Sequence, residues 1–131
     1  MKPSPLRILV VDDHALNLQL AESLLLQMGH HCLLARNGEQ ALAVLASESV
    51  DLVLMDVAMP VMDGMRALQM IRRRPDLPQQ IPVFIVTAHV QAHAQRLYER
   101  IGANGCIAKP VTQEKLQEHL QAFCAVQPVH P

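Results

Sequence analysis

Short, uninterrupted hydrophobic runs recur at nearly regular intervals along the chain. The five runs cover residues 8–11, 32–35, 52–55, 83–86 and, more weakly, 106–108. Each run is too short for a helix, and the first, third and fourth lack the polar alternation of a strand with one exposed face. We therefore expect five strands of a parallel sheet that is covered on both sides.

Segments with a helical spacing of hydrophobic residues separate these runs. The stripes expected to face the sheet are Leu16, Leu20, Leu24 and Met28; Ala41, Val44 and Leu45; Leu68 and Ile71; Val90, Ala94, Leu97 and Ile101; and Leu116, Leu120 and Phe123. Gly29 and Gly102 follow the first and fourth stripes, where glycine commonly ends a helix. Asn37 with Gln40, and Thr112 before the last stripe, predict helix caps.

Five strand–helix units in alternation predict an α/β fold, with a single doubly wound five-stranded parallel sheet and helices on both faces. With right-handed crossovers, a short chain of this kind favours the flavodoxin-like (βα)5 strand order 2-1-3-4-5. The winding then reverses between the first and third strands, and ligands bind at the carboxyl ends of strands beside such a point. The length of 131 residues fits one domain, expected over 1–125, with a loose tail over 126–131.

The balance of charges bears on the kind of partner. Lys and Arg number 11 against 12 Asp and Glu, for a net charge of −1, and aromatic residues make up 2% of the chain. Nucleic-acid binding normally uses a basic surface, and single strands also need stacking aromatic side chains, so we expect no direct nucleic-acid partner. The basic run 72–74 follows a predicted helix and is interpreted as a solvated helix end.

The cysteines and the first residues bear on the cellular compartment. Cys32, Cys106 and Cys124 are odd in number and form no CxxC pair, so we interpret them as small apolar side chains in a reducing environment. The first five residues contain no signal-like apolar region, and no hydrophobic run approaches the roughly 20 residues of a membrane helix. We expect a cytoplasmic domain with no membrane segment.

Carboxylate residues follow the two strands that flank the expected reversal point. Asp12 and Asp13 come directly after the first hydrophobic run, and Asp56 comes directly after the third. Two unit charges about 4 Å apart repel by about 4 kcal/mol at an effective dielectric constant of about 20, so three carboxylates at one edge favour a bound cation. A site of carboxylates, a carbonyl and waters suits Mg²⁺.

Two further polar residues follow the fourth and fifth predicted strands. Thr87 comes directly after the fourth hydrophobic run, and Lys109 comes directly after the fifth. A hydroxyl and an ammonium beside carboxylates suit a phosphoryl group carried near Asp56. Taken alone, Thr87 reads as a helix cap and Lys109 as an ion-pair partner of Asp56.

Together these segments resemble the receiver domain of two-component response regulators. The resemblance is carried by residues 8–13 (ILVVDD), 51–64 (DLVLMDVAMPVMDG), 87–88 (TA) and 109–110 (KP), in this order and at this spacing. It covers nearly the whole chain. The sequence is similar to chemotaxis-type receivers and, in its details, to the receivers carried by hybrid sensor histidine kinases.

The resemblance implies that Asp56 is the phospho-acceptor. Its phosphoryl group would come from a histidine of a sensor kinase or of a histidine phosphotransfer domain. The implied Mg²⁺ (or Mn²⁺) site consists of Asp13, Asp56 and the backbone carbonyl of Ala58, with Asp12 acting through a bound water. Lys109 would hold a phosphoryl oxygen.

The resemblance also implies a switch. Thr87 and the adjoining Ala88 would approach the phosphoryl group, and the surface of the fourth helix, fifth strand and fifth helix would respond. The family usually has an aromatic residue at the position of Cys106, so the switch is expected to be reduced or different here. His89 and Ala58 stand where the family tunes loss of the phosphoryl group, and a cis peptide before Pro110 would aim the lysine into the site.

Two other functions fit a fold of this kind. A Mg²⁺-dependent phosphohydrolase with an aspartyl nucleophile needs an acid near the nucleophile to protonate the leaving group, and Val57 and Ala58 provide none. A flavin-binding electron carrier needs a phosphate-binding loop after the first strand, where Asp12 and Asp13 would repel its ligand. We therefore expect a signalling switch without turnover of an external substrate, acting on an unspecified output partner.

Overall fold

The computed structural model describes residues 5–57, 62–88 and 92–126. The elements in chain order are β1 (Arg7–Val11), α1 (Ala15–Gln27), β2 (His31–Ala35), α2 (Gly38–Ser47), β3 (Leu52–Asp56), α3 (Gly64–Arg73), β4 (Val83–Thr87), α4 (Ala92–Ile101), β5 (Gly105–Ala108) and α5 (Gln113–Val126). The strands pair in parallel, in the order β2-β1-β3-β4-β5. The predicted fold class and strand order are confirmed.

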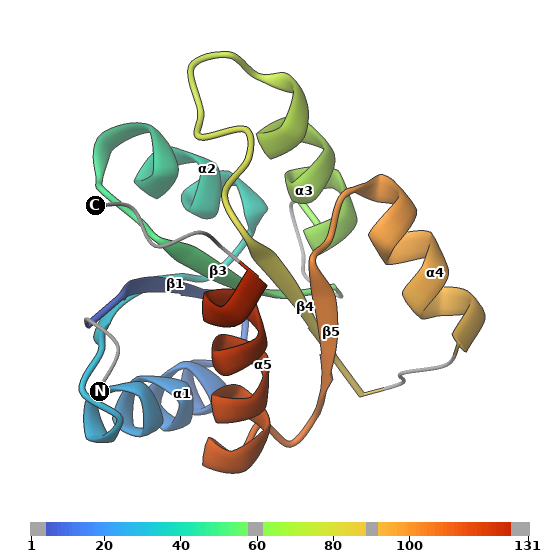
Figure 1. The fold of residues 1–131 in the computed structure, drawn as a ribbon. Helices are drawn as coiled ribbons and strands as arrows, with labels where there is room; N and C mark the ends of the chain where they lie inside the picture. The colour runs from blue at the N-terminus through green and yellow to red at the C-terminus, as the bar shows by residue number, and fades with distance from the viewer. Residues whose placement is uncertain (1–4, 58–61, 89–91, 127–131) are drawn as a thin grey trace.

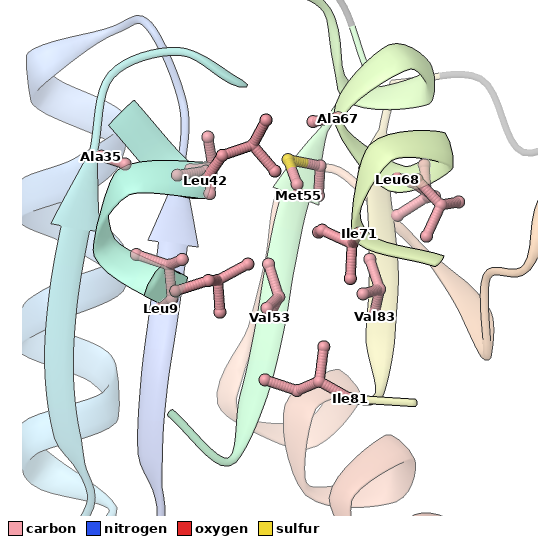
Figure 2. Packing of buried hydrophobic residues seen from close by; sticks show 14 of the residues in the cluster. Leu9, Ala35, Leu42, Val53, Met55, Ala67, Leu68, Ile71, Ile81 and Val83 are labelled. Atoms are coloured by element: carbon pink, nitrogen blue, oxygen red, sulfur yellow. The ribbon is translucent and has the colours of Figure 1, made fainter. Parts of the chain in front are cut away.

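Helices cover both faces of the sheet (Figure 1). α1 and α5 pack on one face, and α2, α3 and α4 pack on the other. Alternate strand residues supply the two layers: Leu9 and Val11 belong to the cluster under α2 and α3, and Ile8 and Val10 to the cluster under α1 and α5. Figure 2 shows the first cluster, where Ile71 of α3 lies over β3 and β4. Burial on both sides explains why the strands are unbroken hydrophobic runs.

The inward face of α1 differs in part from the predicted stripe, whose last two positions pack against the core as expected. Leu16 and Leu20 are 65% and 61% exposed, whereas Leu18 and Leu25 are buried against the sheet. Leucines occur nearly all around this helix, so its spacing fits more than one stripe equally well. Contact with the sheet decides which stripe is buried.

The inward face of α4 also differs in part from the prediction. Leu97 is 45% exposed, while the neighbouring Tyr98 packs with Ile101 against the core. Ala94 is half-buried, and Val90 lies outside the described residues. The remaining stripes are confirmed where they are described: α2, α3 and α5 bury Leu45, Ile71 and Leu116 among others, and the side chain of Phe123 is outside the described part.

The predicted helix ends are confirmed. Gly29 and Gly102 have φ angles of 89° and 127°, a left-handed conformation that glycine adopts without strain. Asn37 Oδ1 accepts a hydrogen bond from the Gln40 backbone N–H at 2.9 Å, and Thr112 Oγ1 accepts one from the backbone of α5 at 3.2 Å. The fifth helix continues to Val126, one residue past the expected domain boundary, and residues 127–131 lie outside the described part.

Arg72 is the exception to the expected solvated helix end. Its guanidinium is half-buried and donates to the carbonyl oxygens of Gly102, Gln79 and Ile81 and to the side-chain oxygen of Asn104. Burial lowers the pKa of this group below its ordinary value. The side chain thus joins α3 to the loops that precede β4 and β5, at the edge of the sheet opposite the strand carboxyl ends.

Within residues 5–57, 62–88 and 92–126, no helix has both the length and the apolar composition that crossing a bilayer requires.

Candidate functional site

The predicted site residues meet at the carboxyl edge of the sheet. Asp56 and Thr87 are the last residues of β3 and β4, and Asp12 and Lys109 directly follow β1 and β5. The backbone extends the sheet contacts into these positions: the Asp12 N–H donates to the Ala35 carbonyl at 3.1 Å, and the Lys109 N–H donates to the Thr87 carbonyl at 2.9 Å. Parallel pairing therefore carries these four side chains to one edge.

Lys109 lies between two buried carboxylates. Its Nζ is 3.4 Å from Asp56 Oδ1 and 3.6 Å from Asp12 Oδ2. Asp12 and Asp56 are 6% and 5% exposed. Because a buried carboxylate is costly without a counter-charge, the ammonium stabilises both anions and keeps them in one site.

Asp12 is held by donors from the residues that follow it, at the start of α1. Its Oδ1 accepts a hydrogen bond from the His14 backbone N–H at 2.9 Å, and its Oδ2 accepts one from Asn17 Nδ2 at 3.2 Å. With Lys109 beside Oδ2, both oxygens of this carboxylate already face donors of the chain. The Asn17 contact was not foreseen from the sequence, although its position one turn into a helix that follows the aspartates indicates it.

Asp13 differs from Asp12 in its contacts. Its Oδ1 is buried and has no hydrogen-bond partner among the described residues, although His14 Nδ1 lies 3.0 Å away without hydrogen-bond geometry. Asp12, Asp13 and His14 together offer three ligand atoms that lie within 4.8 Å of one another. The sequence reasoning assigned no metal role to His14, and its position directly after the two aspartates was the available signal.

Other predicted site residues lie around this edge. Thr87 is half-buried, Ala88 is exposed, and the Lys109–Pro110 peptide bond is cis, as expected. Ala58 and His89 lie outside the described residues.

Comparison with known proteins identifies the family. The family model of the response regulator receiver domain matches residues 8–121. The chain belongs to this family. Receiver domains are signalling switches of two-component systems.

The curated relatives of this receiver domain include much longer histidine kinases. It is 40% identical over 116 residues to the sensor histidine kinase RcsC of Salmonella typhi, and 38% identical over 116 residues to the signal transduction histidine-protein kinase BarA of Escherichia coli. Each match covers 88% of this chain and 12% of the relative. The chain thus spans a small fraction of the length of the curated relatives that it matches.

Solved receiver structures share the fold. The receiver domain of the sensor histidine kinase PA1611 from Pseudomonas aeruginosa matches with a TM-score of 0.82 and 29% identity, over 93% of this chain and 99% of that one. That structure has a magnesium ion coordinated in its active site cleft. The chemotaxis response regulator CheY4 of Vibrio cholerae matches with a TM-score of 0.83 and 27% identity, over 91% and 98% of the two chains.

Cys106 of this receiver domain is buried in β5. Burial raises the pKa of its thiol above the ordinary value, and the negative charge of Glu99 adds to the shift. Its backbone carbonyl lies 3.0 Å from Nε2 of His119, whose Nδ1 is 2.8 Å from the Lys115 carbonyl. The His119 ring also packs edge-on against Phe84, with ring centroids 5.6 Å apart. A histidine of α5 therefore contacts the strand at this position, which the sequence alone did not indicate.

An apolar groove adjoins the site. It has a volume of about 360 Å³ and runs from Asp12 and Lys109 between α1 and the loop before α5. Leu20 and Leu24 of α1 and Val111 line it, so the exposed side of α1 leads directly to the carboxylates.

Proposed function

We propose that this receiver domain accepts a phosphoryl group on Asp56 from a phosphohistidine of a sensor kinase or phosphotransfer domain. The observation that carries the proposal is the pairing of the buried Asp56 carboxylate with Lys109 Nζ, at 3.4 Å. A buried carboxylate next to a fixed ammonium combines a nucleophile with a counter-charge for an incoming anion. The match to the receiver family over residues 8–121 supports the same assignment.

The transfer exchanges one bond to phosphorus for another. A side-chain oxygen of Asp56 attacks phosphorus, and the bond between phosphorus and the histidine nitrogen of the donor breaks, leaving its electron pair on that nitrogen. The product is an acyl phosphate on Asp56. Loss of the signal is hydrolysis: a water oxygen bonds to phosphorus, the bond to Asp56 breaks, and the water gives up a proton. Alignment and charge neutralisation account for most of the catalysis of such steps.

The carboxylates fit a Mg²⁺ or Mn²⁺ ion. Asp13 Oδ1 is buried and accepts no hydrogen bond from the described residues, so a cation would satisfy it, whereas Asp12 already accepts hydrogen bonds from the His14 backbone and from Asn17 of α1. Asp13 and Asp56 would therefore bind directly, with Asp12 acting through water and the Ala58 carbonyl as the further ligand that the family implies. When bound, the ion supplies positive charge opposite the phosphoryl oxygens.

The remaining residues hold the phosphoryl group. Lys109 would keep one oxygen of the group close to its ammonium, which lies 3.4 Å from Asp56 Oδ1. Thr87, at the end of β4, supplies a hydroxyl donor, and the adjoining Ala88 supplies backbone. His89 is the modulatory position beyond them. Each of these groups stabilises an anion that Asp56 carries only when modified.

Switching is proposed for the surface of α4, β5 and α5. Cys106 has no aromatic ring that could change its rotamer when Thr87 moves. The backbone of β5, and the His119 ring that contacts it, would therefore transmit the change in this chain. Amide hydrogen exchange with and without a phosphoryl analogue at Asp56 tests this. We expect changed protection in β5 and α5, and unchanged protection there would contradict the proposal.

Phosphorylation by a small-molecule phosphodonor tests the function directly. Wild type, Asp56→Asn and Asp76→Asn are incubated with the donor and Mg²⁺, and intact mass is measured. Asp76 is an exposed carboxylate that pairs with Arg74, so Asp76→Asn is the matched control. We expect one added phosphoryl group on wild type and on the control, and none on Asp56→Asn. Equal labelling of all three proteins would refute the assignment, and sustained release of phosphate from an external ester would favour a phosphohydrolase.

A further inference from the structure

β5 is an edge strand, so half of its peptide groups face away from the sheet. In the strand order β2-β1-β3-β4-β5, only one side of β5 adjoins another strand. The Lys109 N–H, just past the strand, points toward β4 and donates to the Thr87 carbonyl at 2.9 Å. Since peptide groups alternate in direction along a strand, the carbonyls of Cys106 and Ala108 point toward the free edge. These two carbonyls need partners from outside the sheet.

Two side chains of α5 supply those partners. Lys115 and His119 are four residues apart, so they lie on the same side of the helix. The Lys115 ammonium donates to the Ala108 carbonyl at 3.1 Å, and Nε2 of His119 lies 3.0 Å from the Cys106 carbonyl. One side of α5 thus contacts two successive outward carbonyls of the strand edge.

Lys115 also bonds beyond Lys109. Its ammonium donates to the Pro110 carbonyl at 3.1 Å, in addition to that of Ala108. A single ammonium therefore fixes the backbone immediately before and immediately after Lys109. The Lys115 side chain belongs to a half-buried residue, and it takes part in none of the ion pairs among the described residues. Its donors are used on the backbone that carries Lys109 and not on a carboxylate.

The position of this backbone determines where the Lys109 ammonium lies. Its Nζ is 3.4 Å from Asp56 Oδ1 and 3.6 Å from Asp12 Oδ2, between two buried carboxylates. Groups that stabilise a transferring phosphoryl act through alignment, and a misplacement of about 1 Å can cost up to about 100-fold in rate. A residue that fixes the backbone on both sides of Lys109 therefore bears on the chemistry without touching it.

We propose that Lys115 is a positioning residue for Lys109: it holds the end of β5 so that the Lys109 ammonium stays between Asp12 and Asp56. The inference rests on the proposed function, in which Lys109 holds a phosphoryl oxygen. It adds that α5, through one lysine, sets the place of that ammonium. Lys115 acts on the phosphoryl group only through Lys109.

Labelling by a small-molecule phosphodonor with Mg²⁺ tests the proposal. Lys115→Met keeps a long unbranched side chain and a high helix propensity but removes the donors. We expect it to lower the initial labelling rate about five-fold or more, with a urea midpoint close to that of wild type, because water can bond to the released carbonyls. Lys115→Arg retains donors for both carbonyls and should keep more than about half of the wild-type rate. Arg100→Met, which removes a cation from an exposed position of α4, is the matched control and should keep the full rate.

A second background separates action through Lys109 from an independent effect. In Lys109→Ala, the addition of Lys115→Met should change the labelling rate less than about two-fold, since the ammonium that Lys115 positions is absent. A loss as large as that in the wild-type background would overturn the proposal. Equal rates in wild type and Lys115→Met would also overturn it, as would a rate in Lys115→Arg as low as that in Lys115→Met.

Nuclear magnetic resonance of the side-chain ammonium groups supplies a readout that does not require phosphorylation. The chain has three lysines, Lys2, Lys109 and Lys115, so few signals must be assigned. Lys115→Met should shift the nitrogen signal of Lys109, and Arg100→Met should leave it in place. An unmoved Lys109 signal in Lys115→Met would overturn the proposal whether or not the domain is labelled. A shifted signal together with equal labelling of wild type and Asp56→Asn would instead refute the proposed function and support the positioning role.

Discussion

Arg72 shows how a single side chain can connect segments that are distant along the chain. Its guanidinium donates to three backbone carbonyls and to Asn104, which itself accepts from the Val83 backbone at 2.9 Å. The planar, five-donor geometry of arginine suits such a set, and no carboxylate is needed to hold it. The residue fixes the amino edge of the sheet while the carboxyl edge carries the chemistry.

Replacement of this arginine by lysine is expected to destabilise the domain. Arg72→Lys keeps the charge but loses the forked geometry, so several partly buried carbonyls lose their donors, at a cost of about 1–3 kcal/mol in the free energy of unfolding. Urea denaturation measures the change. Arg73→Lys, at the exposed neighbour, is the control and should leave the midpoint within error. Equal midpoints for both variants would show that the hydrogen bonds of Arg72 make no net contribution to the free energy of unfolding.

His30 makes stability depend on pH. The residue is buried, and its Nδ1 accepts a hydrogen bond from the Leu6 backbone N–H at 3.0 Å. Burial, and secondarily the charge of His31, lower the pKa of His30 below its ordinary value of 6.5. Since the unfolded chain binds the proton more readily, stability is full above about pH 6.5 and falls as the pH decreases below it.

A variant that lacks only His30 isolates this effect. We expect the free energy of unfolding of wild type to decrease more steeply between about pH 7 and pH 5 than that of His30→Gln, which keeps an acceptor but does not titrate in this range. His93→Gln, on the exposed side of α4, serves as the control and should keep the wild-type slope. The same slope in all three proteins would contradict the prediction. Denaturation curves at a series of pH values supply the measurement.

At the scale of elements, the start of α3 lies directly against the end of β3. A Cβ on Gly64 would be 2.1 Å from the Asp56 carbonyl oxygen and 3.0 Å from Met55 Cγ. The Gly64 N–H donates to the Val57 carbonyl at 2.9 Å, and Asp63 caps the helix through the Arg66 backbone N–H. Glycine is thus required here for the close approach of a helix to a strand.

The close approach leads to a prediction for Gly64→Ala. The methyl group must displace the backbone of Asp56, so we expect a loss of about 1–3 kcal/mol in stability together with slower phosphorylation. Gly105→Ala is the matched control, because its Cβ would meet the Phe84 ring at 3.2 Å and His119 Cδ2 at 3.8 Å, which are side-chain atoms and not backbone. Thermal denaturation and labelling by a small-molecule phosphodonor measure the two effects. Similar midpoints for both variants would mean that α3 moves away from β3 without cost.

At the scale of the whole molecule, we expect repulsion within the carboxylate cluster to cost stability when no cation is bound. Folding brings Asp12, Asp13 and Asp56 to one edge, and Lys109 is the cation that directly contacts two of them. Function thus requires an arrangement that costs stability, which is common at functional sites. A bound divalent ion returns that stability through mass action.

Asp13→Asn is expected to raise the stability of the metal-free domain and to reduce the stabilisation by Mg²⁺. In metal-free buffer the variant should be more stable than wild type by about 0.5–1.5 kcal/mol, because one of the clustered charges is removed. Mg²⁺ at about 100 times its dissociation constant should stabilise wild type by about 2.7 kcal/mol and the variant much less. Calorimetric melting with and without Mg²⁺ measures both changes. Asp76→Asn is the control, and a variant that gains nothing without metal would contradict the prediction.

The sequence by itself determined the elements, the fold and the residues of the carboxyl edge. Strands buried on both faces must be unbroken hydrophobic runs, so their positions and parallel order follow from the pattern. Four site residues each end or directly follow such a run: Asp12, Asp56, Thr87 and Lys109. Parallel pairing of the strands then brings them to one edge, independently of how the helices pack.

Only the tertiary structure decided which sides of the helices are buried and which side chains meet across the site. α1 has leucines on nearly every side, so contact with the sheet, and not spacing, buries Leu18 and exposes Leu16. The anchoring of Arg72 and the approach of His14 to Asp13 depend on distances between loops. A one-dimensional pattern encodes the period of an element, whereas such contacts depend on its rotation and its neighbours.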